Sequence, residues 1–429
     1  MNEPTGSRRD AASTIFNLPG YRAIDAVDLP DDGRRITVEA TDPPGCTACG
    51  VIATRVHSRR RQYLRDIPVA GATEVVWAKR RWFCDEDACP RRTFAEATVQ
   101  VPRYARSTRR LYEQLADSVI CSGRAAVEVA RAHGVSWWLV QAALTAAAAV
   151  LLPDVDTIPV RRLGIDEHRY RSVRFYRDTT GAWTRYEPWM TAMVDLATGR
   201  VLGVVDGRDS KAVGTWLKAR SQAWRDRVEV VAIDPSAAFR KALREHLPHA
   251  AVSVDAFHLV KLAGDALTAV RQRLAREHKG RRGRLADPSW ANRKLLLRGA
   301  DTLSERGWDR LEKVFRNDDP TDELGAAWAV KEQVRRLLRT TTLADAWNER
   351  MRLGHYVQVA NMPETDRLYD TIATWWPQIE VLIVTGATNA KVEAANTTVK
   401  QIKRTGRGFR NSHNYKTRIL LTSAARAVA

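Results

Sequence analysis

The sequence feature that most restricts the fold is a pair of short apolar stretches, "LGID" and "VVAID", which end in Asp166 and Asp234. Short apolar runs bounded by polar residues are typical of buried strands. "RRLGIDEHRY" predicts one strand, and "WMTAMVDLATGRVLGVVDG" predicts two more joined by a turn. "VEVVAIDPSAAFRKALREHL" and "AVSVDAFHLVKL" each predict a strand that leads into a helix. This order predicts an α/β fold, a mixed sheet covered by helices, with both acids at the sheet edge where ligands bind.

The remaining sequence divides into further parts around this sheet. "LPDVDTIPVRR" contains two prolines and is typical of a linker, whereas the region after residue 262 is nearly all helical in pattern. We therefore expect an N-terminal segment (1–40), a zinc-ribbon-like domain (41–100), a helix-turn-helix (104–152), the sheet domain (159–262 and 380–425) and a helical region (263–379).

Four cysteines occur as two close pairs, Cys46 with Cys49 in "GCTACG" and Cys84 with Cys89 in "FCDEDACP". Between the pairs, "VHSRRRQYLRDIPV" and "EVVWAKRRWF" are patterned like strands. Two cysteine pairs on hairpins that converge on one ion are typical of a zinc ribbon, because thiolate ligands suit zinc. We expect one structural zinc ion; the alternative is four buried cysteines without a metal.

The stretch "SGRAAVEVARAHGVSWWLVQAALTAAAAVLL" predicts two helices separated by a turn. Gly134 ends the first helix, and Ser136 caps the second. This pattern is typical of a helix-turn-helix, whose second helix enters the DNA major groove. Ser136, Trp137, Trp138 and Gln141 are the candidate DNA-binding residues, with the tryptophans expected to pack or to contact the phosphate side. The alternative is an ordinary helical hairpin within a core.

The charge of the chain favours a polyanionic partner. Lys and Arg number 69 against 50 Asp and Glu, a net charge of +19. Nucleic acid is the first candidate for such a surplus. The N-terminus lacks the apolar segment of a signal peptide, and the apolar run 142–152 is shorter than the roughly 20 residues that span a bilayer. We therefore expect a cytoplasmic, nucleoid-associated protein with no membrane partner and no disulfides.

Residues 388–406, "TNAKVEAANTTVKQIKRTG", contain a single acid, Glu393. The 36 residues after it hold eight Lys or Arg and no acid. On a helix, Asn396, Lys400 and Arg404 return to within about 60° of Glu393, whereas apolar residues gather on the other side. One face is thus expected to be buried, and the other could hold a metal ion and follow a phosphate backbone.

Asp166, Asp234 and Glu393 together predict a metal site. Three adjacent carboxylates repel one another, and a divalent cation relieves the repulsion. Oxygen ligands select magnesium or manganese, and two ions roughly 3.5–4 Å apart suit phosphodiester displacement. Each acid taken alone could equally be a helix cap or a solvated loop residue.

Beyond these patterns, the chain resembles the ISL-three family of bacterial insertion-sequence transposases along almost its whole length. The resemblance rests on "CTAC" with "CDEDAC", "GIDEH", "AIDPSAAF", "VDAFHLVK" and "NAKVEAANTTVKQIKRTGRGFRN". It implies a zinc-binding N-terminus, a helix-turn-helix, and a catalytic domain of ribonuclease-H-like fold with the DDE triad Asp166, Asp234 and Glu393. The spacing of 159 residues between the last two acids (393 minus 234) implies that 263–379 is a helical insertion.

The resemblance also implies further site residues. "DAFH" is similar to an acid-x-x-His motif of related transposases, so Asp255 and His258 are expected to assist at the site; the alternative for His258 is a core histidine. Arg407 and Arg410, in "GRGFRN", join Asn396, Lys400 and Arg404 as candidate DNA contacts. Ala394 stands where family members usually have glycine, a departure that leaves the carboxylate unaffected.

The combined interpretation is a DNA transposase that binds the terminal inverted repeats of its element. It is expected to cleave the element ends and join them to target DNA with two magnesium or manganese ions. A homodimer or larger assembly on double-stranded DNA is expected. The alternatives are a catalytically silent DNA-binding regulator derived from a transposase, and a metal-dependent nuclease of the same fold.

Overall fold

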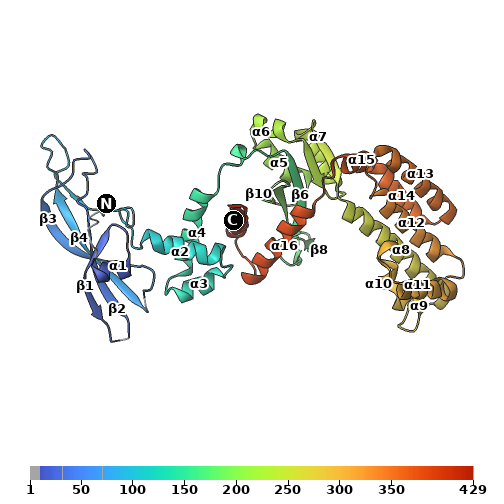
Figure 1. Cartoon of the computed structure of the whole chain (residues 1–429), viewed down its shortest axis with the longest axis horizontal. Coiled ribbons are helices and arrows are strands. Elements are labelled where there is room, and N and C mark those ends of the chain that lie inside the picture. The colour runs from blue at the N-terminus through green and yellow to red at the C-terminus, as the bar shows by residue number, and fades with distance from the viewer. Residues whose placement is uncertain (1–9, 31, 70, 429) are drawn as a thin grey trace, which may run out of the picture. The chain divides into compact units, whose positions relative to one another are not determined.

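Two units make up the chain in the computed structural model, which describes residues 10–30, 32–69 and 71–428. The first unit comprises Met1–Leu152 and Gln401–Arg426, and the second comprises Pro153–Lys400 with Ala427–Ala429. Figure 1 labels the elements of both. The sequence analysis assigned residues up to 425 to the sheet domain, whereas those from Gln401 onward belong to the first unit.

A five-stranded sheet forms the N-terminal part of the first unit. It has the order β1-β2-β4-β3 with β5 paired to β4, and β2 and β4 are parallel. Its core buries Val38, Val75 and Trp77, which explains the apolar spacing along β2 and β4. The sheet includes residues 21–40, which the sequence analysis treated only as an N-terminal segment. The elements are α1 (Ala11–Phe16), β1 (Tyr21–Asp28), β2 (Arg34–Ala40), β3 (Val56–Leu64), β4 (Thr73–Phe83) and β5 (Thr93–Ala95).

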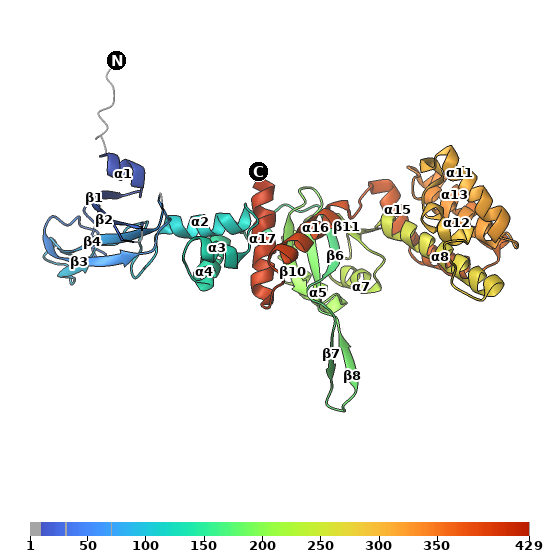
Figure 2. The same cartoon turned by 90° about the horizontal axis from the view of Figure 1, so that it is seen from below.

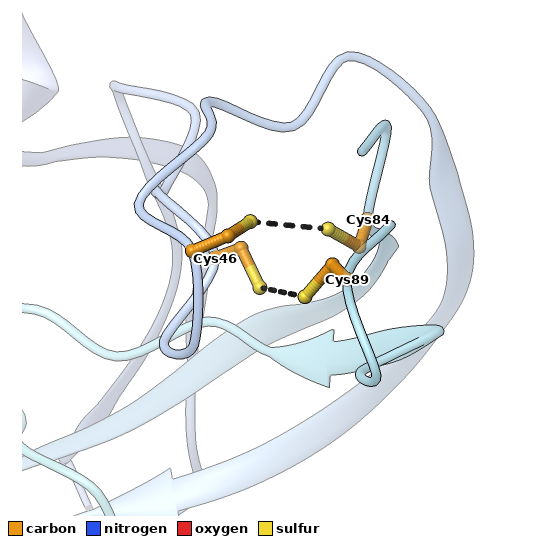
Figure 3. Close-up of side chains that lie close together, drawn as sticks. Cys46, Cys84 and Cys89 are labelled. Carbon is orange, nitrogen blue, oxygen red and sulfur yellow. Dashed lines mark hydrogen bonds between the residues drawn. The ribbon is translucent and has the colours of Figure 1, made fainter. Parts of the chain in front are cut away.

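The four paired cysteines converge beside this sheet, as Figure 3 shows. The Sγ atoms of Cys46 and Cys89 are 3.9 Å apart, those of Cys49 and Cys84 are 3.5 Å apart, and all four lie within 4.8 Å of one another. Tetrahedral zinc with Zn–S bonds of about 2.3 Å places its sulfur ligands about 3.8 Å apart. The thiols therefore fit the expected zinc ion.

Backbone groups around the cysteines favour the thiolate form that zinc requires. The N–H groups of Ala48 and Cys49 donate to the sulfur of Cys46 and lower its pKa to about 6. Backbone N–H groups also act to lower the pKa of Cys49 and of Cys84, but burial and the neighbouring thiols raise both above the usual value in the metal-free cluster. The N–H of Arg91 donates to Cys89 Sγ at 3.4 Å. Gly50 takes a positive φ of 80°, which closes the tight turn after Cys49. The loops are thus arranged for metal binding by their own backbone.

Helices α2 (Arg109–Ile120), α3 (Ala126–Ala132) and α4 (Trp137–Leu151) follow the sheet, and α17 (Ser412–Val428) packs with them. Their shared core includes Leu111, Val129, Val140 and Leu421. The N–H of Leu139 donates to Ser136 Oγ at 3.3 Å, and Gly134 has a φ of 61°. The predicted cap and turn of the helix-turn-helix are therefore confirmed.

By length and hydropathy, Trp137–Thr157 could cross a membrane. However, α4 ends at Leu151, and Pro153 separates it from the short η1 helix (Val155–Thr157). The 15 residues of α4 rise only about 22 Å, less than the roughly 30 Å of a bilayer core. The stretch therefore does not form one continuous spanning helix.

The second unit is built on a five-stranded mixed sheet of order β10-β9-β6-β11-β12. Strand β9 is antiparallel to both neighbours, whereas β6, β11 and β12 are parallel. This is the predicted ribonuclease-H-like arrangement, in which a three-strand meander leads to two parallel strands with crossover helices. The elements are β6 (Arg162–Arg169), β9 (Trp189–Asp195), β10 (Val201–Asp206), α5 (Ser210–Lys218), α6 (Gln222–Arg227), β11 (Val230–Ile233), α7 (Ala237–His246) and β12 (Ala251–Val254).

A two-stranded hairpin of β7 (Arg174–Arg177) and β8 (Trp183–Tyr186) interrupts the meander between β6 and β9. Figure 2 shows it projecting away from the sheet of the second unit. The sequence analysis did not predict this element.

The region between β12 and the last part of the second unit is helical, as predicted. Its first helix, α8, begins directly after β12 and is 24 residues long. This helix therefore crosses the boundary predicted between the sheet domain and the helical region at residue 263. The members are α8 (Ala256–Lys279), α9 (Pro288–Ala291), α10 (Arg293–Leu296), η2 (Ala300–Thr302), α11 (Glu305–Asp318), α12 (Glu323–Leu337), α13 (Leu343–Ala360), α14 (Pro363–Thr374) and α15 (Trp376–Thr385).

Helix α16 (Ala390–Thr405) carries Glu393 and packs directly on β6. The contact point is Gly164, because a Cβ atom there would lie 2.7 Å from Leu196 and closer still to Val392. The absence of a side chain at Gly164 thus sets how near α16 approaches the sheet. From the sequence we expect the helix with Glu393 to be the last of the chain, and this was wrong, since α17 follows α16.

Cys49→Ser is expected to lower the zinc content from one ion per chain and to loosen the N-terminal sheet. Zinc binding contributes folding free energy where ligands from distant loops meet. Elemental analysis and limited proteolysis measure the two effects. The control is Cys121→Ser, which alters an exposed cysteine outside the cluster. Purified wild-type protein without zinc would contradict the assignment.

Gly164→Ala is expected to lower the free energy of unfolding by about 1–3 kcal/mol, because the added methyl group overpacks the contact with α16. Adding Val392→Ala should recover part of that loss, since the two changes act on one contact. Denaturant unfolding of the two single variants and the double variant gives the coupling. If the two substitutions changed the free energy of unfolding in a strictly additive way, the packing of α16 on β6 would not depend on this contact.

Candidate active site

Asp166 and Asp234 occupy equivalent positions on adjacent strands. Ile165 on β6 pairs with Ile233 on β11 in parallel register, and each isoleucine is followed by one of the acids. Both isoleucines are fully buried, so the sheet core fixes the register. Neighbouring strands lie about 4.8 Å apart, which brings the two carboxyl groups together. Asp234 directly follows β11, as predicted for an acid at a strand end, whereas Asp166 lies within β6, which continues to Arg169.

The two carboxyl groups lie close enough to share a hydrogen bond. Burial and the charge of Asp234 raise the pKa of Asp166 to about 7. Burial also raises the pKa of Asp234, although His258 and Asn389 oppose the shift. The pair therefore favours a shared proton or a bound cation over two free negative charges.

Asn396 of helix α16 and Asn389, the residue directly before that helix, bind this pair. Asn389 Nδ2 donates to Asp234 Oδ1 at 3.1 Å, and Asn396 Nδ2 donates to Asp166 Oδ2 at 2.6 Å. Both side chains are buried. The sequence analysis expected Asn396 to contact DNA, but the structure engages its amide with Asp166. Asn389 was missed, although its position one helical turn before Glu393 could have identified it.

Glu393 lies on the same face of α16 as these asparagines. It is four residues after Asn389 and three before Asn396, and all three positions fall within an arc of about 60°. Its side chain is exposed. The helix therefore presents the third predicted acid on the face whose asparagines bind Asp166 and Asp234.

The start of α16 is held by the end of the neighbouring strand β12. Ser253 Oγ donates to the carbonyl oxygen of Ala387 at 2.6 Å, and the N–H of Asn389 donates to Asp255 Oδ1 at 3.2 Å. Both Ser253 and Asp255 are buried. Residues far apart in sequence are thus fixed at one place before the helix begins.

His258 bridges two carboxylates at the N-terminus of α8. Its Nε2 lies 3.1 Å from Asp234 Oδ2, and its Nδ1 lies 3.1 Å from Asp255 Oδ2. The hydrogen bond to Asp255 and the charges of Asp234 and Asp255 raise the pKa of His258 despite its burial. Burial raises the pKa of Asp255, but hydrogen bonds from His258 and Asn389 hold it below its usual value. A protonated His258 therefore supplies positive charge to this carboxylate group.

The donor set fits a hard divalent cation. Asp166, Asp234 and the exposed Glu393 offer carboxylate oxygens. The Oδ1 atoms of Asn389 and Asn396 are buried without a hydrogen-bond partner among the described residues. A separate trio, Asp234, Asp255 and His258, has ligand atoms within 4.8 Å of one another. In that trio, His258 already binds both acids.

The other predicted residues lie outside this cluster. Lys400, Arg404, Arg407 and Arg410 are exposed, and Arg407 lies 3.9 Å from Glu128. In the helix-turn-helix, Trp138 is 76% exposed and Trp137 is 37% exposed, whereas Gln141 is half-buried. Helix α4 contains no Lys or Arg, so it offers few groups for phosphate contact.

Family models match both parts of the chain. The model described as "Transposase", for the DDE domain of the ISL3 (ISL-three) elements, matches residues 163–419, more than half of the chain. The model described as "zinc-finger of transposase IS204/IS1001/IS1096/IS1165" matches residues 42–89, which contain all four clustered cysteines.

Individual relatives agree with these matches. The transposase of insertion sequence element IS1001 from Bordetella parapertussis is 24% identical, with 95% of this chain and 96% of that protein covered. The transposase of IS1557 from Mycobacterium tuberculosis is 24% identical, with 72% of this chain and 69% of that protein covered.

A structure of the Drosophila P element transposase strand transfer complex is also similar. It has a TM-score of 0.38 and 11% identity, with 73% of this chain and 91% of that chain covered. This partial similarity carries no argument here; the fold follows from the strand order and the family model. On the match of more than half of its length to the DDE transposase model, the chain belongs to the ISL-three family of insertion-sequence transposases.

Proposed function

We propose that the chain binds the terminal inverted repeats of its element, cleaves the element ends and joins them to target DNA. The observation that carries this proposal is that Asp166 on β6 and Asp234 directly after β11 lie side by side, and that each is held by an asparagine directly before or within the helix that presents Glu393. Two half-buried, hydrogen-bonded acids beside a third, exposed acid are suited to phosphodiester chemistry with divalent metal ions.

In this proposal, Asp166, Asp234 and Glu393 hold two magnesium or manganese ions. When bound, the ions supply Lewis acidity at the scissile phosphate. Asn389 and Asn396 fix the carboxylate orientations, and the His258–Asp255 pair restrains Asp234. Water attacks phosphorus, and the 3′ oxygen of the element end leaves as a hydroxyl. That hydroxyl then attacks a target phosphodiester and releases a target 3′ oxygen.

DNA contacts in this proposal come from several surfaces of the protein. The zinc-ribbon and helix-turn-helix regions bind the inverted repeats, with Ser136, Trp137, Trp138 and Gln141 on the recognition helix. The exposed cations Lys400, Arg404, Arg407 and Arg410 contact phosphates. The chain acts as a homodimer or larger assembly on paired ends. Joining of a pre-cleaved end to a plasmid distinguishes this function from that of a nuclease or a silent regulator.

Glu393→Gln is expected to reduce nicking of a labelled element end in magnesium at least about a thousandfold, or about 4 kcal/mol in activation free energy. Binding measured in calcium should stay within a few-fold, because the lost charge acts mainly in the transition state. Asp166→Asn and Asp234→Asn should behave alike, and combining the changes should add little.

The matched control is Glu305→Gln, since Glu305 is also an exposed glutamate in the first turn of a helix. It should nick at the wild-type rate. Efficient nicking by Glu393→Gln would contradict the assignment of Glu393 and favour a different set of metal ligands.

The stability of the metal-free protein is expected to fall as pH rises toward about 7, the pKa of Asp166 in the fold. The folded state retains a proton that an unfolded Asp has lost above about pH 4, so the free energy of unfolding decreases across this window. The raised pKa of His258 acts in the same direction. Magnesium binds the ionised form, so its stabilising effect should grow with pH over the same range.

Melting temperatures in chelator and in magnesium, measured from pH 5 to 8, test this expectation. Asp166→Asn should show a shallower pH dependence in chelator and a smaller gain from magnesium. The same pH dependence in both proteins would mean that Asp166 does not titrate in this range.

A further inference from the structure

The β7–β8 hairpin exposes four aromatic side chains that the proposed chemistry does not use. Phe175 is 62% exposed, Trp183 is 67% exposed, and Tyr176 and Tyr186 are each 51% exposed. A two-stranded ribbon has no core in which to bury such side chains and is at best marginally stable alone in water. This concentration of exposed aromatic surface indicates a binding partner.

The strand register places arginines beside these aromatic residues on both faces of the hairpin. Phe175 pairs with Arg185, and Arg177 pairs with Trp183, so these four share one face. Arg174 pairs with Tyr186 on the other face. The guanidinium carbon of Arg177 lies 5.2 Å from the centre of the Trp183 ring. Each face thus combines flat apolar rings with planar cations.

The two acids of the hairpin region are occupied by internal contacts. Asp178 accepts hydrogen bonds from the N–H groups of Thr180 at 2.9 Å and Ala182 at 3.1 Å, which order the turn. Glu187 accepts a hydrogen bond from Trp189 Nε1 at 2.8 Å and pairs with Arg185 and Arg169. The hairpin therefore has a fixed turn and a fixed base, and it keeps an excess of positive charge.

The base of the hairpin lies next to the candidate active site. Strand β6 runs directly from Asp166 to Arg169 and then into the hairpin. Trp189 at the start of β9 lies between the guanidinium groups of Arg169 and Arg208, at 5.0 and 4.5 Å from its ring centre. Arg208 in turn lies 3.6 Å from Glu167, the neighbour of Asp166. The ribbon is thus an extension of the strand that carries the first acid.

We propose that the β7–β8 hairpin binds unpaired bases of the DNA beside the scissile phosphate, by stacking them on Phe175 and Trp183. This inference rests on the proposed function and adds to it a site for single-stranded or unstacked DNA. Arginine pairs with phosphate and also stacks on flat rings, and aromatic side chains stack on bases whose faces are free. In an intact duplex the base faces are covered by neighbouring bases. The hairpin could then contact only phosphates through its arginines, and the aromatic residues would have no bases to stack on.

The experiment compares two DNA probes made from the sequence directly flanking the coding region. One is a paired duplex, and the other is the same duplex with a short mismatched fork at the element end. Binding is measured in calcium with the full chain carrying Asp166→Asn, which prevents cleavage. The test variant adds Phe175→Leu and Trp183→Leu, and the matched control adds Phe175→Tyr and Trp183→Phe. The hairpin has no core, so unchanged melting temperatures are expected for both.

The parent protein should bind the fork more tightly than the duplex. The leucine variant should lose about tenfold or more in fork affinity with little change for the duplex, because stacking on each base is lost. The aromatic control should keep the preference. An unaltered fork preference in the leucine variant would overturn the inference.

Two further outcomes separate the possible causes of failure. Light scattering could show that the leucine variant no longer self-associates while its preference for the fork is unchanged. The hairpin would then be a protein–protein contact, and this inference alone would be overturned. If the parent protein bound neither probe, and cleavable wild-type protein did not nick the duplex, the proposed function would fail and this inference with it.

Discussion

The repulsion between the carboxyl groups of Asp166 and Asp234 is the constraint on which the arrangement of the second unit depends. Two acids at the same level of adjacent, buried strands cannot both be ionised without compensation. The fold compensates with hydrogen bonds from Asn389 and Asn396 and with the charge of His258. Asn396 belongs to α16, Asn389 directly precedes that helix, and His258 belongs to α8, so the elements that cover this part of the sheet also supply the groups that compensate the two acids.

Helix α16 meets this need because of how closely it approaches β6. The missing side chain at Gly164 admits Val392, and the end of β12 holds the residues just before the helix. The apolar side of α16 is therefore buried against the sheet, while Asn389, Glu393 and Asn396 face the acids or solvent. The same amphipathic pattern that packs the helix thus also orders its polar face.

The proposed DNA contacts are divided between different kinds of surface. The helix α4 is apolar and lacks cations, which limits its part in phosphate binding. Positive charge lies instead on α16, on the segment after it and on the β7–β8 hairpin. Phosphate contacts supply much of DNA affinity and make it salt-dependent, whereas base contacts and stacking supply discrimination. The hairpin is a surface on which positive charge and exposed aromatic rings occur together.

The sequence by itself determined the zinc cysteines, the cap and turn of the helix-turn-helix pattern, the alternation of strands and helices, and the two acids that follow buried apolar residues. These features depend on local spacing and on periodic burial, which a single chain segment displays. Only the tertiary structure decided which residues bind the two acids. Asn389 is 155 residues from Asp234 in the sequence, and Asn396 is 230 residues from Asp166. The strands of residues 21–40 and the β7–β8 hairpin also escaped the sequence analysis. Strands β1, β7 and β8 consist mainly of exposed residues with little apolar alternation, so only strand pairing defines them. Strand β2 does alternate, with Ile36, Val38 and Ala40 buried, and this signal was missed.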